Sequence, residues 1–428
     1  MSAMKKTRRI LILTLLLLTS FANHVFGQDS IEINEIRTDL DGKTKRGVLL
    51  KELGLESGQQ YESLEDLEIF IQFHVNNLLR RRLFKSFEWN ILPAGEGLVD
   101  IQIQLEDSVT LIPRPILKYS TARGLTFGLK ADYYNAFGTL TDHMVQGYWS
   151  PIELLFEYNV DNIIVGKFHL GMNIKQFDGT TRYGNIDGNT VAEYRSTYSQ
   201  LSGSLDIPLA SISPWTYTVT PLLSWQYNHR MISNETSYPD EVFRNYGFSP
   251  GLNHGFVLDD VDWVGNFRKG LYFDMMNYNL WYTGSGTSDL FLESDLKGFI
   301  PLTSWFEISG RISGFYSFTG PRDNAGDRLR GVVDYMTYGA WGNYLSLQTN
   351  FKVFETPRGL ALHLRPFTDI GYVYSEYWGN GPDAWEYCVG STIIVFFKAL
   401  PSLNLNIDCG WDLKRNMPEL IIETISFY

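Results

Sequence analysis

From Pro113 to its last residue, the chain consists of segments in which apolar and polar residues alternate. In residues 125–133, for example, Leu, Phe, Leu, Ala and Tyr alternate with Thr, Gly, Lys and Asp. Successive side chains of a β-strand point to opposite faces of the sheet, so each such segment has one apolar and one polar face. Strands of this kind are typical of a transmembrane β-barrel, with lipid outside and water in the lumen, although a soluble β-sandwich also alternates.

The lengths of the connections separate these two folds. Short connections at residues 210–214, 300–303, 355–358 and 398–401 take turns with long ones at residues 178–193, 229–247 and 319–341. Outer-membrane barrels have short periplasmic turns and long outer loops, whereas the turns of a sandwich are short at both ends. The segments from Ile116 to Tyr428 number about 16, an even count that returns the C-terminus to the periplasmic side.

The composition agrees with a barrel and argues against other classes. Aromatic residues make up 15% of the 428 residues, and there are 38 Gly and 25 Tyr but only 20% charged residues. This excess suits the aromatic girdles that flank the apolar band of a membrane barrel. The net charge of -12 argues against a nucleic-acid partner. Beyond the first residues, no apolar run reaches the roughly 20 residues that a membrane-spanning helix needs.

Residues 1–27 have the pattern of an export signal. Four basic residues between positions 5 and 9 precede an apolar run at residues 10–18, and residues 25–27 offer a cleavage site before Gln28. The alternative is a transmembrane anchor, for which the apolar run is too short. We therefore expect a signal peptide that is removed on export.

Residues 28–110 predict a small α/β domain. Strand patterns at residues 31–40, 86–92 and 98–105 surround helical patterns at residues 44–55 and 63–83, and Ser63 offers an N-terminal cap to the second helix. The order is strand, helix, helix, strand, strand. The run Arg80-Arg81-Arg82 at the end of the second helix is either a partner-binding patch or an ordinary solvated helix end.

This order of elements resembles a POTRA domain. Residues 53–58 (Leu-Gly-Leu-Glu-Ser-Gly) and 83–87 (Leu-Phe-Lys-Ser-Phe) stand at two of the family's signatures, with Arg82 where the family has glycine. The resemblance implies a domain that binds other chains by adding their strands to an exposed sheet edge. A small spacer without a ligand is the alternative.

Two short motifs stand out in the barrel region. One is Leu329-Arg330-Gly331-Val332, in the long connection between the eleventh and twelfth predicted strands. The other is Phe367-Thr368-Asp369-Ile370-Gly371, on the thirteenth, where Asp369 shares a face with His363 and Arg365. Together they resemble the sixth-loop and thirteenth-strand motifs of the BamA, TamA and two-partner-secretion transporter superfamily. Val332 replaces the usual aromatic residue, and Asn350 and Lys352 stand where glutamate and arginine are common.

The resemblance implies that the loop folds back into the lumen and that Arg330 meets Asp369. The chemistry agrees, because a charge-assisted hydrogen bond in a partly desolvated lumen is stronger than a surface ion pair. Gly331 would let the loop backbone approach the wall. We predict a site made of Leu329, Arg330, Gly331, Phe367, Asp369 and Gly371. The loop is either a stabilising strut or a moving part.

A second predicted site is the seam between the first and last strands. The chain ends in an alternating strand with a terminal aromatic residue, which resembles the signal by which outer-membrane proteins are inserted. If Glu423 faces the lumen, the lipid face of this strand is weakly apolar, which is compatible with lateral opening. The predicted seam residues are Ile116, Leu117 and Tyr119 in the first strand and Ile422, Thr424 and Tyr428 in the last.

The sequence thus predicts a membrane β-barrel of about 16 antiparallel strands at residues 111–428, preceded by a POTRA-like domain at residues 28–110. The expected function is outer-membrane protein assembly or insertion, and the alternatives are a two-partner-type secretion pore and a porin-like structural barrel. Expected partners are outer-membrane lipid, unfolded outer-membrane or secreted polypeptides, and periplasmic accessory proteins or lipoproteins. No arrangement of residues indicates an enzyme, a cofactor or a metal site. Cys388 and Cys409 fall on opposite strand faces, which excludes a disulfide.

Overall fold

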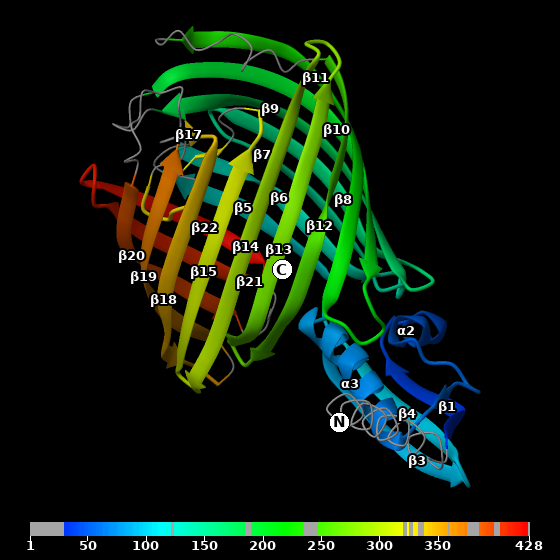
Figure 1. Ribbon diagram of the computed structural model, residues 1–428. Coiled ribbons are helices and arrows are strands. Elements are labelled where there is room, and N and C mark those ends of the chain that lie inside the picture. The colour runs from blue at the N-terminus through cyan, green and yellow to red at the C-terminus, as the bar shows by residue number, and fades with distance from the viewer. Residues whose placement is uncertain are drawn as a thin grey trace, which may run out of the picture.

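The structure, a computed structural model, consists of a small α/β domain and a large closed β-barrel (Figure 1). It describes residues 30–120, 124–184, 190–234, 247–319, 323–324, 328–332, 338–357, 359–374, 385–397 and 403–426. The expected signal peptide at residues 1–27 and the seam residue Tyr428 lie outside the described residues. No helix among the described residues is long and apolar enough to cross a membrane.

The α/β domain has the element order that the sequence predicts, with one short strand added. Its elements are β1 (Ile31–Asp41), α2 (Arg46–Leu53), β2 (Gln60–Tyr61), α3 (Leu64–Arg80), β3 (Phe84–Gly95) and β4 (Leu98–Asp107). The sheet order is β2-β1-β4-β3, with β1 parallel to β4 and β3 antiparallel to it. The Ser63 side chain accepts a hydrogen bond from the Asp66 backbone N–H at 3.1 Å and so caps α3, as the sequence predicts.

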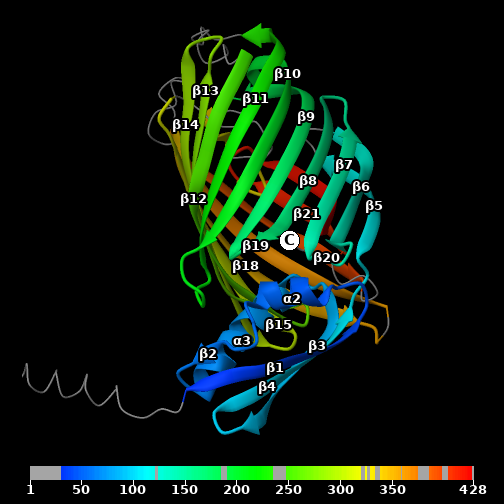
Figure 2. The same cartoon turned by 90° about the vertical axis from the view of Figure 1, so that its right-hand side faces the viewer.

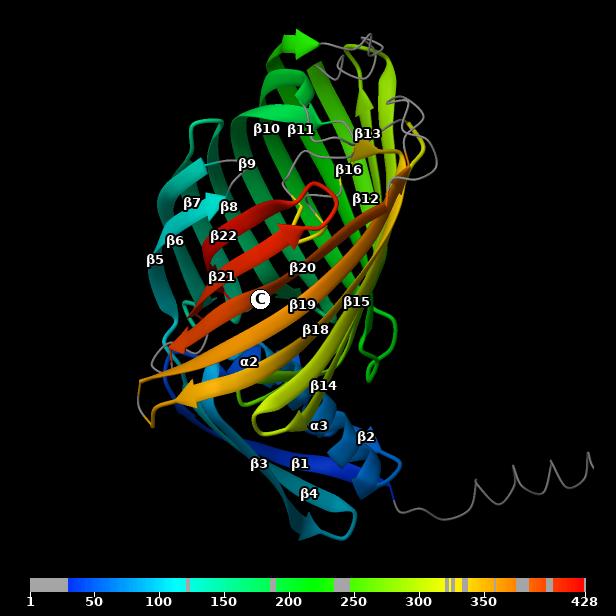
Figure 3. The ribbon, with the colours of Figure 1, turned by 90° about the vertical axis from the view of Figure 1, so that its left-hand side faces the viewer.

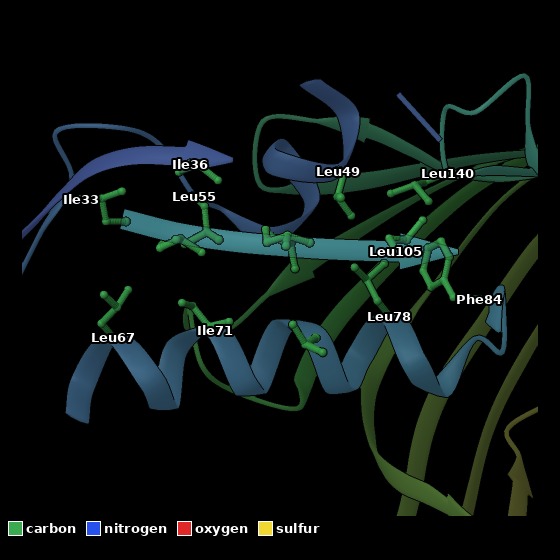
Figure 4. Close-up of a cluster of buried hydrophobic side chains, with 14 of the residues drawn as sticks. Ile33, Ile36, Leu49, Leu55, Leu67, Ile71, Leu78, Phe84, Leu105 and Leu140 are labelled. Carbon is green, nitrogen blue, oxygen red and sulfur yellow. The ribbon is translucent and has the colours of Figure 1, made fainter. Parts of the chain in front are cut away.

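The core of this domain lies between α3 and the sheet (Figure 4). The helix contributes Leu67, Ile71, Val75 and Leu78, which are spaced along one face and are all buried. Opposite them lie buried side chains of β1 and β4. Leu140, which belongs to the barrel, is fully buried in the same cluster. The core is therefore shared between the two parts of the chain.

The barrel is a closed ring of 16 strands, in the number that the sequence predicts. Its strands are β5 (Leu111–Ser120), β6 (Gly124–Ala136), β7 (Thr141–Trp149), β8 (Glu153–Val165), β9 (Phe168–Gly184), β10 (Thr190–Pro208), β11 (Trp215–Asn234), β12 (Gly247–Val264), β13 (Phe267–Tyr282), β14 (Thr287–Thr303), β15 (Phe306–Ser317), β18 (Trp341–Glu355), β19 (Leu360–Tyr374), β20 (Trp385–Phe397), β21 (Leu403–Asp412) and β22 (Met417–Ser426). All neighbours are antiparallel, and β22 pairs with β5 to close the ring (Figure 3). The short strands β16 (Asp323–Asn324) and β17 (Tyr338–Gly339) form a separate pair within the connection from β15 to β18.

The alternation of the sequence becomes the two faces of the wall. In β6, Phe127 and Leu129 are 50% and 72% exposed on the outside of the barrel. Thr126, which precedes Phe127 and points to the other face, is only 4% exposed. The two cysteines behave as predicted, because Cys388 is buried, Cys409 is exposed and both are free. The α/β domain lies against one end of the barrel, next to the short turns (Figure 2).

Candidate functional site

The connection between β15 and β18 enters the barrel and packs inside it. Leu329 and Val332 are each only 1% exposed. They belong to an apolar cluster inside the lumen with Phe291, Phe315, Tyr344, Phe367, Val373 and Cys388, which come from five strands of the wall. The apolar residues on either side of Arg330-Gly331 therefore anchor the loop, so that its arginine is held in one place.

Arg330 is bound to the wall at several points. Its Nε and Nη2 atoms donate hydrogen bonds to the two carboxylate oxygens of Asp369 at 3.0 and 2.7 Å, and its backbone N–H donates to the same carboxylate at 3.3 Å. Its Nη1 atom donates to Gln348 at 2.5 Å, and its guanidinium lies 3.8 Å from the centre of the Phe367 ring. Asp369 is fully buried. A buried carboxylate without a partner is costly, so the fork-shaped guanidinium compensates for its desolvation.

Two glycines allow the loop backbone to approach the wall. A Cβ atom on Gly331 would lie 2.5 Å from the Cβ of Cys388 on β20 and 3.0 Å from the backbone nitrogen of Trp411 on β21. A Cβ atom on Gly410 would lie 2.4 Å from the Cα of Gly331. Both distances to carbon are shorter than a side chain tolerates, so this contact requires glycine on each side.

The structure brings all six predicted loop-site residues together. Gly371 completes the set, because a Cβ there would lie 2.9 Å from Leu329. Sequence reasoning missed Gln348, Ser309, which accepts a hydrogen bond from Gln348 at 3.0 Å, and Gly410. The sequence held a signal for Gln348, because it lies two residues before Asn350 and so shares its strand face.

The two positions of β18 that depart from the superfamily pattern form contacts with residues other than Arg330. The side chain of Asn350 is hydrogen-bonded to His363 at 3.0 Å, and Lys352 is paired with Glu355 at 2.7 Å. His363, fully buried, also packs against the rings of Phe267 and Phe396. These side chains lie near the end of β18 and the start of β19, on either side of the short turn that joins the two strands.

The predicted seam has the fewest paired positions of any strand pairing in the described part of the barrel wall. Up to residue 120, where the described part of this segment ends, β5 and β22 are paired at three positions, Lys118 with Glu423, Tyr119 with Ile422 and Ser120 with Ile421. By contrast, β5 has ten paired positions with β6, and β22 has ten with β21. Of the predicted seam residues, Tyr119 and Ile422 are therefore partners.

The remaining seam residues need a correction. Ile116 and Leu117 pair with Gly128 and Phe127 of β6 and have no recorded partner in the described part of β22. Thr424 pairs with Leu405 of β21. The physical reason is that the pairing of β5 with β22 begins only at Lys118. The part of β5 before Lys118 pairs with β6 but not with the described part of β22.

The N-terminal end of β22 is fixed to β21 and β20, away from the seam. Arg415, in the turn between β21 and β22, forms ion pairs with Asp412 at 2.6 Å and with Glu386 of β20 at 2.7 Å. All three side chains are nearly inaccessible. The strands on the C-terminal side of the seam are thus joined to one another by charge pairs as well as by backbone hydrogen bonds.

The run Arg80-Arg81-Arg82 joins the α/β domain to the barrel. Arg80 forms ion pairs with Asp260 and Asp262, both at 2.7 Å, next to the turn between β12 and β13. Arg82 donates to the Gly265 carbonyl in that turn at 2.8 Å. The run is therefore neither a free partner patch nor a solvated helix end, because the folded chain uses its charges itself.

Arg81 binds a second turn, between β6 and β7. It donates to the Leu140 carbonyl at 2.7 Å and forms an ion pair with Asp142 at 2.8 Å. In the same turn, the Gly138 carbonyl accepts a hydrogen bond from the Lys45 backbone N–H at 2.9 Å. The buried Leu140 side chain completes the contact, so the turn forms part of the domain core.

Glu52 of α2 contributes to the same interface. Burial raises the pKa of its carboxyl, but the hydrogen bond with His169 of β9 at 3.0 Å and the charges of His169 and Arg81 outweigh burial, so its pKa lies below the usual value. Glu52 is therefore a carboxylate at neutral pH and holds α2 against the barrel.

No group of three or more His, Cys, Asp or Glu side chains in the described parts of the chain could hold a metal ion. The described sites present hydrogen-bonding groups and paired charges, among them Arg330 with Asp369 and Arg415 with Glu386.

These features define a 16-stranded β-barrel of the outer-membrane type with a loop bound in its lumen. No family model and no curated protein sequence matches the chain. Solved structures do match. BamA from Haemophilus ducreyi lacking POTRA domains 1–3 is 14% identical with a TM-score of 0.59, over 93% of this chain and 85% of that chain.

Two further structures have the same fold. CdiB from Acinetobacter baumannii is 15% identical with a TM-score of 0.63, over 93% of this chain and 74% of that chain. CdiB from Escherichia coli is 12% identical with a TM-score of 0.62, over 93% of this chain and 76% of that chain. The resemblance that the loop and strand motifs predicted is confirmed at the level of the fold.

Proposed function

We propose that this protein is a non-enzymatic factor that inserts β-barrel proteins into the bacterial outer membrane. In this proposal the α/β domain is a periplasmic POTRA-like domain, and the seam between β5 and β22 is a lateral gate. Its partners are outer-membrane lipid, unfolded outer-membrane polypeptides and periplasmic accessory proteins or lipoproteins.

The short seam is the observation that carries the proposal. Among the described residues, which leave out 121–123, three paired positions close the wall there, whereas the neighbouring interfaces have ten each. Within the described part of the wall, opening the ring at this place therefore separates the fewest paired positions. An opened β5 offers unpaired N–H and C=O groups, and an incoming strand can pair with them one residue at a time.

The two sides of the seam are supported unequally, which favours a gate in which β5 moves. Arg330 binds Asp369 on β19 and Gln348 on β18, and Gly331 lies against β20 and β21. Arg415 joins the turn of β21 and β22 to β20. These contacts stabilise the C-terminal strands as one unit, and β22 is part of that unit.

The α/β domain offers a second edge, on the path to the gate. Among the described residues, β3 pairs with β4 alone, so its other edge is open. β4 ends at Asp107 and the gate strand β5 begins at Leu111. A polypeptide that adds to β3 is thus bound one strand away from the segment that becomes β5. Backbone pairing of this kind tolerates many sequences, as a general insertion factor requires.

A secretion pore of the two-partner type is the second candidate, because CdiB shares the fold over 93% of this chain. It requires a path through the lumen. The bound loop and the packing of Phe267 and His363 across the lumen oppose this path unless both are displaced. A porin-like structural barrel is opposed by the same two obstacles.

Depletion of the protein in its native cells, followed by quantitative mass spectrometry of the outer membrane, tests the proposal. We expect several unrelated β-barrel proteins to fall in abundance together. Loss of a single exported protein, with barrel proteins unchanged, would support the secretion pore instead. A large steady conductance of the purified protein in planar bilayers, with no change in other barrels on depletion, would support the porin.

A further inference from the structure

A small cavity of about 220 Å³ lies inside the barrel beside the bound loop. Five of its lining side chains are cationic: Arg268 of β13, Lys297 of β14, Arg311 of β15, and Arg328 and Arg330 of the loop. No Asp or Glu is among the described residues that line it. The hydroxyl groups of Ser309 and Ser346 and the amide of Gln348 complete its polar lining.

The acids nearest to the cavity are already engaged. Asp295 is paired with Arg311 at 2.8 Å and with Lys297 at 3.0 Å. Glu293 is paired with Arg328, and Asp369 with Arg330. These three carboxylates are shared among four of the five cations, so positive charge and N–H donors remain in excess around the cavity.

Arg268 differs from the other four cations. Its backbone N–H donates to Glu307 at 2.7 Å, but its guanidinium forms no hydrogen bond or ion pair with any described residue. The guanidinium instead lies 3.8 Å from the centre of the Phe299 ring. Stacking uses the face of the guanidinium and leaves the N–H groups in its plane available. The nearby Glu307 carboxylate is buried and accepts its hydrogen bond from the Arg268 backbone, so the N–H groups of the guanidinium remain available to an anion from outside.

We propose that this cavity is a binding site for a phosphoryl group, with Arg268 as its principal ligand. The volume suits a group of this size rather than a folded segment of chain. A phosphoryl group has several acceptor oxygens in a tetrahedral arrangement and carries more charge than a carboxylate. The cavity supplies matching donors from strands β13, β14, β15 and β18 and from the loop.

The site goes beyond the proposed function, because it does not depend on whether the barrel inserts proteins, secretes them or does neither. It has a consequence for the loop, since Arg328 and Arg330 line the same cavity. A bound phosphoryl group would join the loop to β13 through Arg268. The ligand is either free in solution, as phosphate or a soluble phosphomonoester, or it is a lipid headgroup that enters the lumen.

Titration of the detergent-solubilised full-length protein with inorganic phosphate tests the first source by isothermal calorimetry. We expect saturable binding by the wild type, weakened about tenfold or more in Arg268→Gln, because a charge-assisted bond to the anion is lost. Arg195→Gln is the matched control. It removes an arginine paired with Asp178 on strands that do not line the cavity, and phosphate affinity should be unchanged.

The second source is tested by flotation with phosphatidylcholine vesicles that contain phosphatidate. If phosphate itself does not bind, a lipid headgroup is supported when the wild type and Arg195→Gln float with these vesicles and Arg268→Gln does not. Heat-dependent electrophoretic mobility reports whether each variant is folded. If Arg268→Gln does not fold, Arg268→Lys is tested in its place. This variant keeps the charge but loses the planar guanidinium, so it should bind the probe more weakly than the wild type. The proposal is overturned if the wild type binds neither probe, or if the folded Arg268 variant binds as the wild type does.

Discussion

Asp369 of β19 accepts hydrogen bonds on both carboxylate oxygens from Arg330. Arg330 lies 39 positions earlier in the chain, in the loop between β15 and β18. Asp369 is fully buried, and the Arg330 side chain is 25% exposed. The pair therefore joins a loop to the wall in a place where neither charge is well solvated. Loop and wall should lose stability together when either partner is removed.

We predict strong coupling between Arg330→Ala and Asp369→Ala. Arg330→Ala leaves a buried carboxylate unpaired and should cost about 3–5 kcal/mol, whereas the double variant should cost clearly less than the sum of the two single variants. Urea unfolding of the barrel in lipid vesicles measures these values. Additive effects would show that the two side chains do not interact in the folded protein. Arg195→Ala serves as a control, because its ion pair with Asp178 is more exposed and should matter little.

A second prediction concerns the contact between two glycines. Gly410→Ala should displace the loop, because the added Cβ would lie 2.4 Å from the Cα of Gly331. The Arg330 peptide bond should then become accessible to trypsin added on the outside of vesicles. Gly203→Ala, in β10, is the control, since its nearest neighbour at 3.7 Å leaves room for a methyl group. Equal resistance of both variants to trypsin would contradict the close packing of the loop.

The arginine run gives a third prediction, on the α/β domain. Arg81→Ala removes the ion pair with Asp142 and the hydrogen bond to Leu140, and should cost about 2–4 kcal/mol because the Asp142 carboxylate is only 19% exposed. Hydrogen exchange should rise in residues 136–142 and in α2, without change in β18–β20. Lys85→Ala, whose ion pair with Glu106 is exposed on both sides, should leave exchange unchanged. Unchanged exchange in Arg81→Ala would show that the domain is held by other contacts.

The fourth prediction is a pH dependence from His74 of α3. Burial lowers the pKa of this histidine below its ordinary value of 6.5, and the charge of Glu52 offsets burial only in part. Because the folded pKa is the lower one, the unfolded domain binds more protons, and stability falls as the pH drops below about 6.5. Exchange of the α3 amides should therefore accelerate between pH 7 and pH 5 more in the wild type than in His74→Gln. The same pH slope in both proteins would contradict this.

Much of the barrel could be predicted because its physics is local. Alternation in segments such as residues 125–133 fixes which side chains face lipid, and the lengths of the turns fix which end is which. Arg330 and Asp369 could be paired because their motifs resemble those of a known superfamily. Gly410 could not, because its role depends on where the loop backbone lies in space. Nothing in its local sequence distinguishes it from other strand glycines.

The contacts between the two parts of the chain were also beyond sequence reasoning. Arg80, Arg81 and Arg82 look like any basic helix end, and their partners come from barrel turns about 60 and 180 residues away. The extent of the seam was likewise hidden. Ile116 and Tyr119 lie in the same strand with the same alternation, yet only Tyr119 has a partner in β22. Register between the ends of a closed sheet depends on the whole ring.

A disulfide across the seam is the most informative single measurement. Tyr119→Cys and Ile422→Cys, combined with Cys388→Ser and Cys409→Ser, place two thiols at directly paired positions. Insertion of a β-barrel substrate into vesicles that contain this variant is then compared before and after reduction. We predict little insertion with the disulfide formed and recovery when it is reduced. Undiminished insertion with the seam locked would contradict a function that depends on opening between β5 and β22.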